Sequence, residues 1–144
     1  TFNATIKTDF DDSIGLINVI PQDIGRVILN LITNAFYAVS CIAPKSPKGN
    51  LPYTPIVTVT TKLIKSPLGD LGVNVSVSDN GPGIPKSALD KIFQPFFTTK
   101  PTGQGTGLGL SLSYDIVKAH GGELIVETKE GEGTAFTIQL PMGS

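Results

Sequence analysis

The sequence predicts an α+β fold, a two-layer sandwich in which helices cover one face of a mixed, mostly antiparallel sheet. Two observations lead to this class. About six short segments alternate apolar and polar residues as strands do, whereas only two long segments have the period of a helix. Most of the strand segments are joined by short turns, which is typical of antiparallel hairpins packed against helices.

The first half of the chain contains two strand segments and one long helix. Residues 3–8 alternate as a strand, and residues 15–20 form a second, short one. Pro21 is well suited to open a helix. The following segment, 22–40, has one apolar face, made of Ile24, Val27, Ile28, Leu31, Ala35 and Val39. The stretch from Pro44 to Pro55 is rich in Pro, Lys, Gly and Ser and is predicted to be a loop.

The second half contains two strand pairs and a second long helix. A hairpin turn is expected at 68–70, and Gly121 and Gly122 are expected to end the long helix. In order, the predicted elements are strands 56–64 and 72–78, a short helix 85–91, a helix from about 107 to 119, and strands 123–128 and 134–140.

The composition fits one cytoplasmic domain. We expect the domain to cover residues 1–141 and Met142–Ser144 to be a cloning remnant. The 11 basic and 12 acidic residues give no electrostatic sign of nucleic-acid binding. The single cysteine, Cys41, excludes an internal disulfide and favours a reducing compartment. No apolar run is long enough to span a membrane. Because the chain begins at Thr1, we expect it to belong to a longer protein, whose other parts can be membrane-anchored.

A glycine stands at every second position from Gly103 to Gly109, just before a helical pattern. Glycine allows backbone to approach a ligand closely, and the N-terminus of a helix attracts anions. The stretch matches neither of the common Gly-rich phosphate motifs, so it predicts a phosphate site of another design, with a plain surface loop as the alternative. Lys100 is the nearby cation that can meet phosphate charge. The phenylalanines before it are expected to anchor a mobile segment or to fill the core: Phe93, Phe96 and Phe97.

Two further motifs carry polar groups suited to a ligand. Asn30 and Asn34 lie one helical turn apart, where their carboxamide oxygens can bind a metal or a polar ligand group; a solvated helix face is the alternative. Asp79 ends an apolar strand, and its carboxylate can accept a hydrogen bond from an amino group such as that of adenine. Gly81 and Gly83 let backbone come close beside it, although a plain turn would have the same residues.

Together these motifs resemble the ATP-binding catalytic domain of sensor histidine kinases. The superfamily also includes gyrase, the ninety-kilodalton heat-shock chaperone and the mismatch-repair ATPase. The Pro-Phe-Phe-Thr-Thr-Lys stretch further resembles the branch of nitrogen-regulation sensor kinases. The matching segments follow the family's order over nearly the whole chain, at 30–35, 79–84, 92–100, 105–110, 120–122 and 133–136.

The resemblance implies a role for each site residue. Asn34 would be the Mg²⁺ ligand, with Asn30 close to the triphosphate, and Asp79 would bind adenine. Thr134 would support Asp79 through its hydroxyl or a water. A lid would span about 98–106. The remaining contacts to ATP would come from Gly81, Gly83, Ile84, Lys100, Gly105, Thr106, Gly107, Leu108 and Gly109.

The implied reaction is transfer of the γ-phosphoryl group of Mg-ATP to a histidine on a separate dimerisation domain, with a response regulator downstream. Asn30, Asn34 and Lys100 are the expected catalytic residues. Gyrase-like members carry a water-activating glutamate where this chain has Asn30, so we expect slow hydrolysis and no autophosphorylation by the chain alone. An anti-sigma-factor-type serine kinase and a nucleotide-binding regulatory module without transfer activity are the alternatives.

Two features depart from the family pattern, and the single histidine needs its own interpretation. Tyr37 stands where many family members carry a basic residue, which puts a phosphate contact from that position in doubt. The loop 41–55 is longer than usual, and a surface insertion is the simplest interpretation. His120, the single histidine, precedes Gly121 at the predicted end of a helix. We expect it to be structural, bonding the last helix carbonyls, rather than to accept phosphate.

Overall fold

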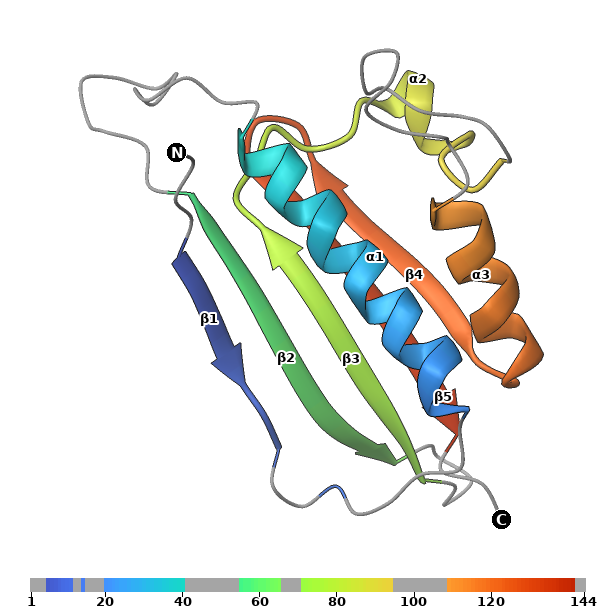
Figure 1. Cartoon of the computed structure of the whole chain (residues 1–144). Helices are drawn as coiled ribbons and strands as arrows, with labels where there is room; N and C mark the ends of the chain where they lie inside the picture. Colours follow the sequence, from blue (N-terminus) through green and yellow to red (C-terminus); the bar gives the residue numbers. More distant parts are fainter. Residues whose placement is uncertain are drawn as a thin grey trace.

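The chain forms one five-stranded sheet with helices on one of its faces (Figure 1). This arrangement is seen in a computed structural model, which describes residues 5–11, 14, 20–40, 55–65, 71–94 and 109–141. The elements, in chain order, are β1 (Thr5–Asp9), α1 (Pro21–Ser40), β2 (Ile56–Lys65), β3 (Leu71–Asp79), α2 (Lys86–Leu89), α3 (Gly109–Ala119), β4 (Glu123–Lys129) and β5 (Gly133–Pro141).

The sheet is mixed, and its strand order is β1-β2-β3-β5-β4. β1 and β2 are parallel, so α1 lies on the crossover between them. The pairs β2–β3, β3–β5 and β4–β5 are antiparallel. The predicted fold class is therefore confirmed. Of the second strand expected at 15–20, only Ile20 lies among the described residues, and the expected turn at 68–70 lies outside them.

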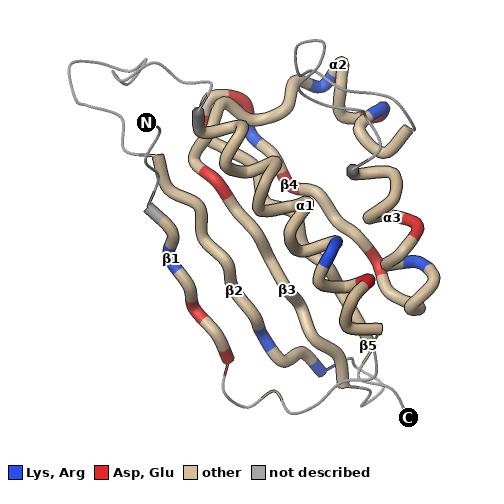
Figure 2. The backbone as a smooth tube through the Cα atoms, viewed as in Figure 1, with Lys and Arg blue, Asp and Glu red and all other residues tan. Residues whose placement is uncertain are grey.

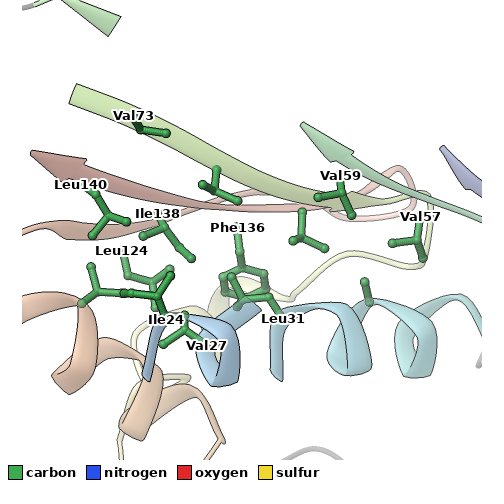
Figure 3. Close-up of a cluster of buried hydrophobic side chains, with 14 of the residues drawn as sticks. Ile24, Val27, Leu31, Val57, Val59, Val73, Leu124, Phe136, Ile138 and Leu140 are labelled. Carbon is green, nitrogen blue, oxygen red and sulfur yellow. The ribbon is translucent and has the colours of Figure 1, made fainter. Parts of the chain in front are cut away.

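The core lies between α1 and the sheet. Figure 3 shows Ile24, Val27 and Leu31 directed from α1 toward the strands, with Leu31 beside Phe136 of β5. The period of the α1 pattern places these residues on one face, and the strands contribute every second residue, as in Thr134–Leu140 of β5. Burying each such side chain contributes roughly 1.5–3 kcal/mol, so this layer fixes α1 over the centre of the sheet.

The helix boundaries differ slightly from the predicted ones. α2 ends at Leu89 and the chain continues in turns to Phe93, so the predicted helix 85–91 is shorter than expected. α3 begins at Gly109 rather than near 107. Within the described ranges, no helix combines the length and apolar character needed to cross a membrane.

Candidate functional site

Asp79 is the last residue of β3, and its carboxylate is partly withdrawn from water. Its Oδ1 accepts the backbone N–H of Gly81 at 2.9 Å. Burial raises the pKa of Asp79 above its ordinary value of 3.8, while hydrogen bonds from the backbone N–H groups of Gly81 and Thr134 lower it. The strand pairing explains the second bond, because Asp79 and Thr134 are register partners. The carboxylate is thus a fixed acceptor at a sheet end.

The loop after Asp79 packs closely against α1. A Cβ on Gly81 would lie 2.9 Å from Asp79 Oδ1 and 3.1 Å from Ala38. That distance is shorter than ordinary van der Waals contact, so only glycine fits here without a shift. Ala38 is one helical turn after Asn34 on α1. The acidic strand end and the carboxamides of α1, separated by about forty-five residues in sequence, are therefore brought to the same end of the fold.

The hairpin between β4 and β5 holds the same loop from its other side. Gly83 has a φ of +79°, and a Cβ there would lie 2.5 Å from the carbonyl oxygen of Lys129. The backbone N–H of Gly131 donates to the carbonyl of Pro82 at 2.7 Å. The N–H of Ile84 donates to Thr128 Oγ1 at 2.8 Å. The segment 79–84 is consequently clamped between α1 and the hairpin, which gives a ligand a preformed surface.

Thr134 is buried and takes part in a small hydroxyl network. Thr128 Oγ1 donates to the carbonyl of Gly133 at 3.1 Å and lies 2.9 Å from Thr134 Oγ1. Since the one hydroxyl hydrogen of Thr128 is used on Gly133, Thr134 is the donor between the two threonines. The Thr134 backbone N–H bonds to Asp79, and the Thr134 hydroxyl bonds to Thr128. Support of Asp79 by this hydroxyl through a water stays a prediction.

Thr128 was not predicted from the sequence. It connects the Ile84 backbone, the Gly133 carbonyl and the Thr134 hydroxyl. Alternation along β4 gives the signal that could have found it. Leu124 and Val126 face the helices, and Thr128 is the next residue on that face. A polar residue that ends an apolar row, paired with Thr134 on β5, is the signal.

Asn30 and Asn34 form a carboxamide stripe on α1, and Asn30 of this stripe contacts α3. Asn30 and Asn34 are both half-buried. The Asn30 Nδ2 donates to the hydroxyl of Ser113 at 3.4 Å, and Ser113 on α3 is 0% exposed. Figure 1 shows the two helices running next to each other over the sheet. Asn30 is therefore not fully solvated, because its amide contacts a buried hydroxyl, and its role toward a ligand stays a prediction.

Part of the predicted phosphate site cannot be placed. Five of its residues lie outside the described ranges: Lys100, Gly105, Thr106, Gly107 and Leu108. Gly109 is the first residue of α3, so the glycine stretch leads directly into a helix N-terminus, as the pattern predicts. Phe93 contacts Tyr114 of α3, with ring centroids 5.3 Å apart, so the chain approaching this stretch is anchored on α3. Phe96 and Phe97 are outside the described residues.

His120 has the structural role that its position predicts. Its Nδ1 lies 2.8 Å from the carbonyl oxygen of Ile116, and its Nε2 accepts the backbone N–H of Ile20 at 3.0 Å. These two bonds require the tautomer with hydrogen on Nδ1. The ring therefore joins the end of α3 to the residue before α1, with both nitrogens occupied.

Two depressions mark the surface around these elements. One of about 330 Å³ is lined by Asp79, Thr128, Lys129 and Thr134, among others. A larger one, of about 640 Å³, lies between α3 and the start of α1, next to His120. Both linings carry carboxylates, Asp23 and Asp115 in the larger depression and Asp79, Glu127 and Glu132 in the smaller one, so charge does not distinguish the two. The clamped loop 79–84, rather than either depression, marks the Asp79 end as the candidate ligand site. Within the described residues, no group of three His, Cys, Asp or Glu side chains is placed to hold a metal.

Known proteins resemble this chain in sequence and in fold. The chain is 38% identical over 132 residues to the sensor histidine kinase ZraS of Escherichia coli, which covers 92% of this chain and 24% of ZraS. It is 35% identical to sporulation kinase E of Bacillus subtilis, over 97% of this chain and 16% of that protein. The chain thus spans about a quarter or less of these relatives.

A solved structure and a family profile agree with these relatives. The nucleotide-free catalytic domain of the histidine kinase ThkA superimposes with a TM-score of 0.74 at 31% identity, covering 96% of this chain and 79% of that one. The profile described as histidine kinase-, DNA gyrase B- and HSP90-like ATPase matches residues 20–144. The chain therefore belongs to this ATPase family, as an ATP-binding catalytic domain of the histidine kinase type.

Proposed function

We propose that this chain binds Mg-ATP between the Asp79 loop and the carboxamide stripe of α1, and transfers the γ-phosphoryl group to a histidine on a separate dimerisation domain. The observation that carries the proposal is the packing of Gly81 on Ala38 of α1. This contact brings the adenine-binding candidate Asp79 to the helix that bears Asn30 and Asn34. The reaction belongs in the cytoplasm, where ATP is available, and its product would pass to a response regulator.

The purine end of the nucleotide would be held by the Asp79 carboxylate. The bonds from Gly81 and Thr134 fix this group and leave acceptor capacity for an amino group, since a carboxylate has about four lone-pair sites. Gly83 and Ile84 belong to the same clamped loop and would line the base pocket. Because the site is partly desolvated, a charge-assisted hydrogen bond is stronger there than in water.

The phosphate end would be held by Mg²⁺, α1 and the glycine stretch. Mg²⁺ prefers oxygen ligands and commonly takes only one or two from protein, the rest coming from phosphates and water. The carboxamide oxygen of Asn34 suits this requirement, and the ion would neutralise phosphate charge during transfer. Lys100 and the N–H groups of Gly105, Gly107 and Leu108 would contact the phosphates, with Thr106 beside them and Gly109 opening α3.

The absence of a carboxylate at position 30 supports transfer to a protein acceptor rather than to water. The Asn30 carboxamide is no base, and its amide nitrogen is directed at Ser113. Water activation in phosphoryl transfer needs a group that positions and deprotonates the nucleophile. The isolated chain should therefore hydrolyse ATP slowly in a steady-state assay. Rapid turnover would contradict this assignment of position 30.

The decisive experiment supplies the acceptor in trans. The chain is mixed with the dimerisation domain of its parent kinase and radiolabelled ATP, and the expected product is an acid-labile phosphohistidine on that domain. Asn34→Ala should abolish the label, as should a magnesium chelator. Asn74→Ala is the matched control, because Asn74 lies on the sheet face away from the helices.

Each contrary outcome identifies an alternative. An acid-stable label would indicate a serine kinase of the anti-sigma-factor type. Tight ATP binding without any label on the acceptor would indicate a regulatory module without transfer activity. The relative ZraS is a sensor histidine kinase, which favours neither alternative.

A further inference from the structure

β1 is the last strand at one edge of the sheet, and its outer edge is the edge that does not pair with β2. Among the described strands, β1 pairs only with β2, and Figure 1 shows it beyond the area covered by α1. An edge of this kind presents backbone N–H and C=O groups that can pair with another strand.

Two large apolar side chains lie along this edge. Ile6 is 55% exposed and Phe10 is 57% exposed. Ile6 is the register partner of the buried Val57, so its side chain lies on the helix side of the sheet, where α1 does not cover it. The segment stays attached to β2 beyond Phe10, because Asp11 Oδ2 accepts the N–H of Leu63 at 2.9 Å and the N–H of Asp11 donates to Thr61 Oγ1 at 3.0 Å.

The residues of this edge are complementary to themselves when the strand is reversed. In an antiparallel pair centred on Thr8, Ile6 lies opposite the partner's Phe10, and Lys7 lies opposite the partner's Asp9. Figure 2 shows the basic and acidic positions following one another along β1. Facing apolar residues and facing opposite charges are both favourable cross-strand pairs. By two-fold symmetry, each of these pairs occurs twice.

The neighbouring registers are disfavoured by charge. Centring the pair on Lys7 would place two lysines opposite each other, and centring it on Asp9 would do the same with two aspartates. Like charges that face each other across strands are destabilising. A lysine on an edge strand usually discourages pairing, but here the partner's Asp9 would neutralise it. The pattern therefore favours the register centred on Thr8 over its two neighbours, and this register gives the isologous contact expected between identical chains.

We propose that two copies of this chain associate through β1, in antiparallel register about Thr8, so that one sheet continues through both copies. Ile6 and Phe10 of each copy would cover one another on the helix side of the joint. This contact does not involve the nucleotide site, so a test of dimerisation and a test of the proposed kinase activity have independent outcomes.

A cross-linking experiment tests the register. In a Cys41→Ser background, which removes the single native cysteine, Thr8→Cys places a thiol on the two-fold axis, where facing Cα atoms lie about 4.5–5.5 Å apart. Mild oxidation should then give a disulfide-linked dimer. Ile6→Cys is the matched control on the same face of the same strand. The two copies of residue 6 would be roughly 14 Å apart, beyond the about 7 Å that a disulfide can bridge, so it should stay unlinked.

Charge reversal tests the pairing. Sedimentation equilibrium of the wild-type chain should show a reversible dimer at or below about 1 mM protein. Lys7→Asp or Asp9→Lys alone should weaken association by roughly tenfold or more, since both pairs become like-charged. An equimolar mixture of the two variants should regain association as a heterodimer, and the double variant K7D/D9K should regain it by itself.

Three results would overturn the proposal. The first is a wild-type chain that stays monomeric up to that concentration, as it would if the edge served a strand of a different protein. The second is a dimer that both single charge variants form as well as the wild type, because another surface would then be responsible. The third is disulfide formation that is equal at positions 6 and 8.

Discussion

The substitution Asp79→Asn separates the role of the carboxylate charge from the role of its shape. Asparagine has the same size, and its carbonyl oxygen can still accept the N–H of Gly81 that Oδ1 accepts at 2.9 Å. The other carboxylate oxygen is replaced by an NH₂ group, which donates instead of accepting. The loop should therefore keep its clamped structure, while the proposed acceptor for the adenine amino group is lost.

The expected loss follows from the kind of bond removed. A hydrogen bond to a charged acceptor contributes roughly 1.5–3 kcal/mol, which corresponds to a Kd for ATP that rises roughly 10- to 150-fold. Partial burial of Asp79 places the change toward the upper part of this range, because water screens the bond incompletely. Base discrimination should also change. Inosine triphosphate has a carbonyl where adenine has its amino group, so the variant should discriminate against it much less than the wild type does.

Isothermal titration calorimetry with both nucleotides measures these effects, and a thermal melt checks that the variant is folded. Asp90→Asn is the matched control, since Asp90 is an exposed carboxylate just after α2 and should bind ATP as the wild type does. A folded Asp79→Asn variant whose ATP affinity lies within twofold of the wild type would remove Asp79 from the site and refute the reasoning.

Three further predictions concern stability and pH. Gly83→Ala should lower the free energy of unfolding by roughly 2 kcal/mol or more in urea titrations, because the added Cβ would meet a backbone carbonyl at 2.5 Å. Gly131 is the control, since it has a similar φ of +81° but no atom within 4 Å of an added Cβ. Gly131→Ala should lower the free energy of unfolding by only about 1 kcal/mol. Leu31→Ala should cost about 2–5 kcal/mol because Leu31 is fully buried, whereas Leu29→Ala, at 62% exposure, should stay within about 0.5 kcal/mol in the same assay. Burial raises the pKa of Asp79, so the native state keeps the carboxyl proton to higher pH than the unfolded chain does. The free energy of unfolding should therefore fall as pH rises from 3.8 through the raised pKa. Unfolding curves measured across this range should lack that part of the slope in Asp79→Asn.

The sequence alone predicted most of the fold. The apolar face of α1 and the alternation of β2, β3 and β5 are local patterns with periods of 3.6 and 2, and each gives its element and its buried face directly. The short turns between the strands predicted antiparallel pairing, and the ordered motifs predicted the family. The boundaries of α2 and α3 differ from the predicted ones because packing, rather than local preference, decides where such short helices begin and end.

What the tertiary structure decided is which distant groups meet. Nothing in the sequence near Gly81 shows that it packs on Ala38, that the hydroxyl of Thr134 pairs with Thr128, or that Asn30 is directed at a buried serine of α3. These contacts depend on the strand order β1-β2-β3-β5-β4 and on the position of α1 over the sheet, which long-range burial of apolar surface selects. The type and spacing of a residue determine which kinds of bond it can form, and only the packed chain determines which residue is its partner.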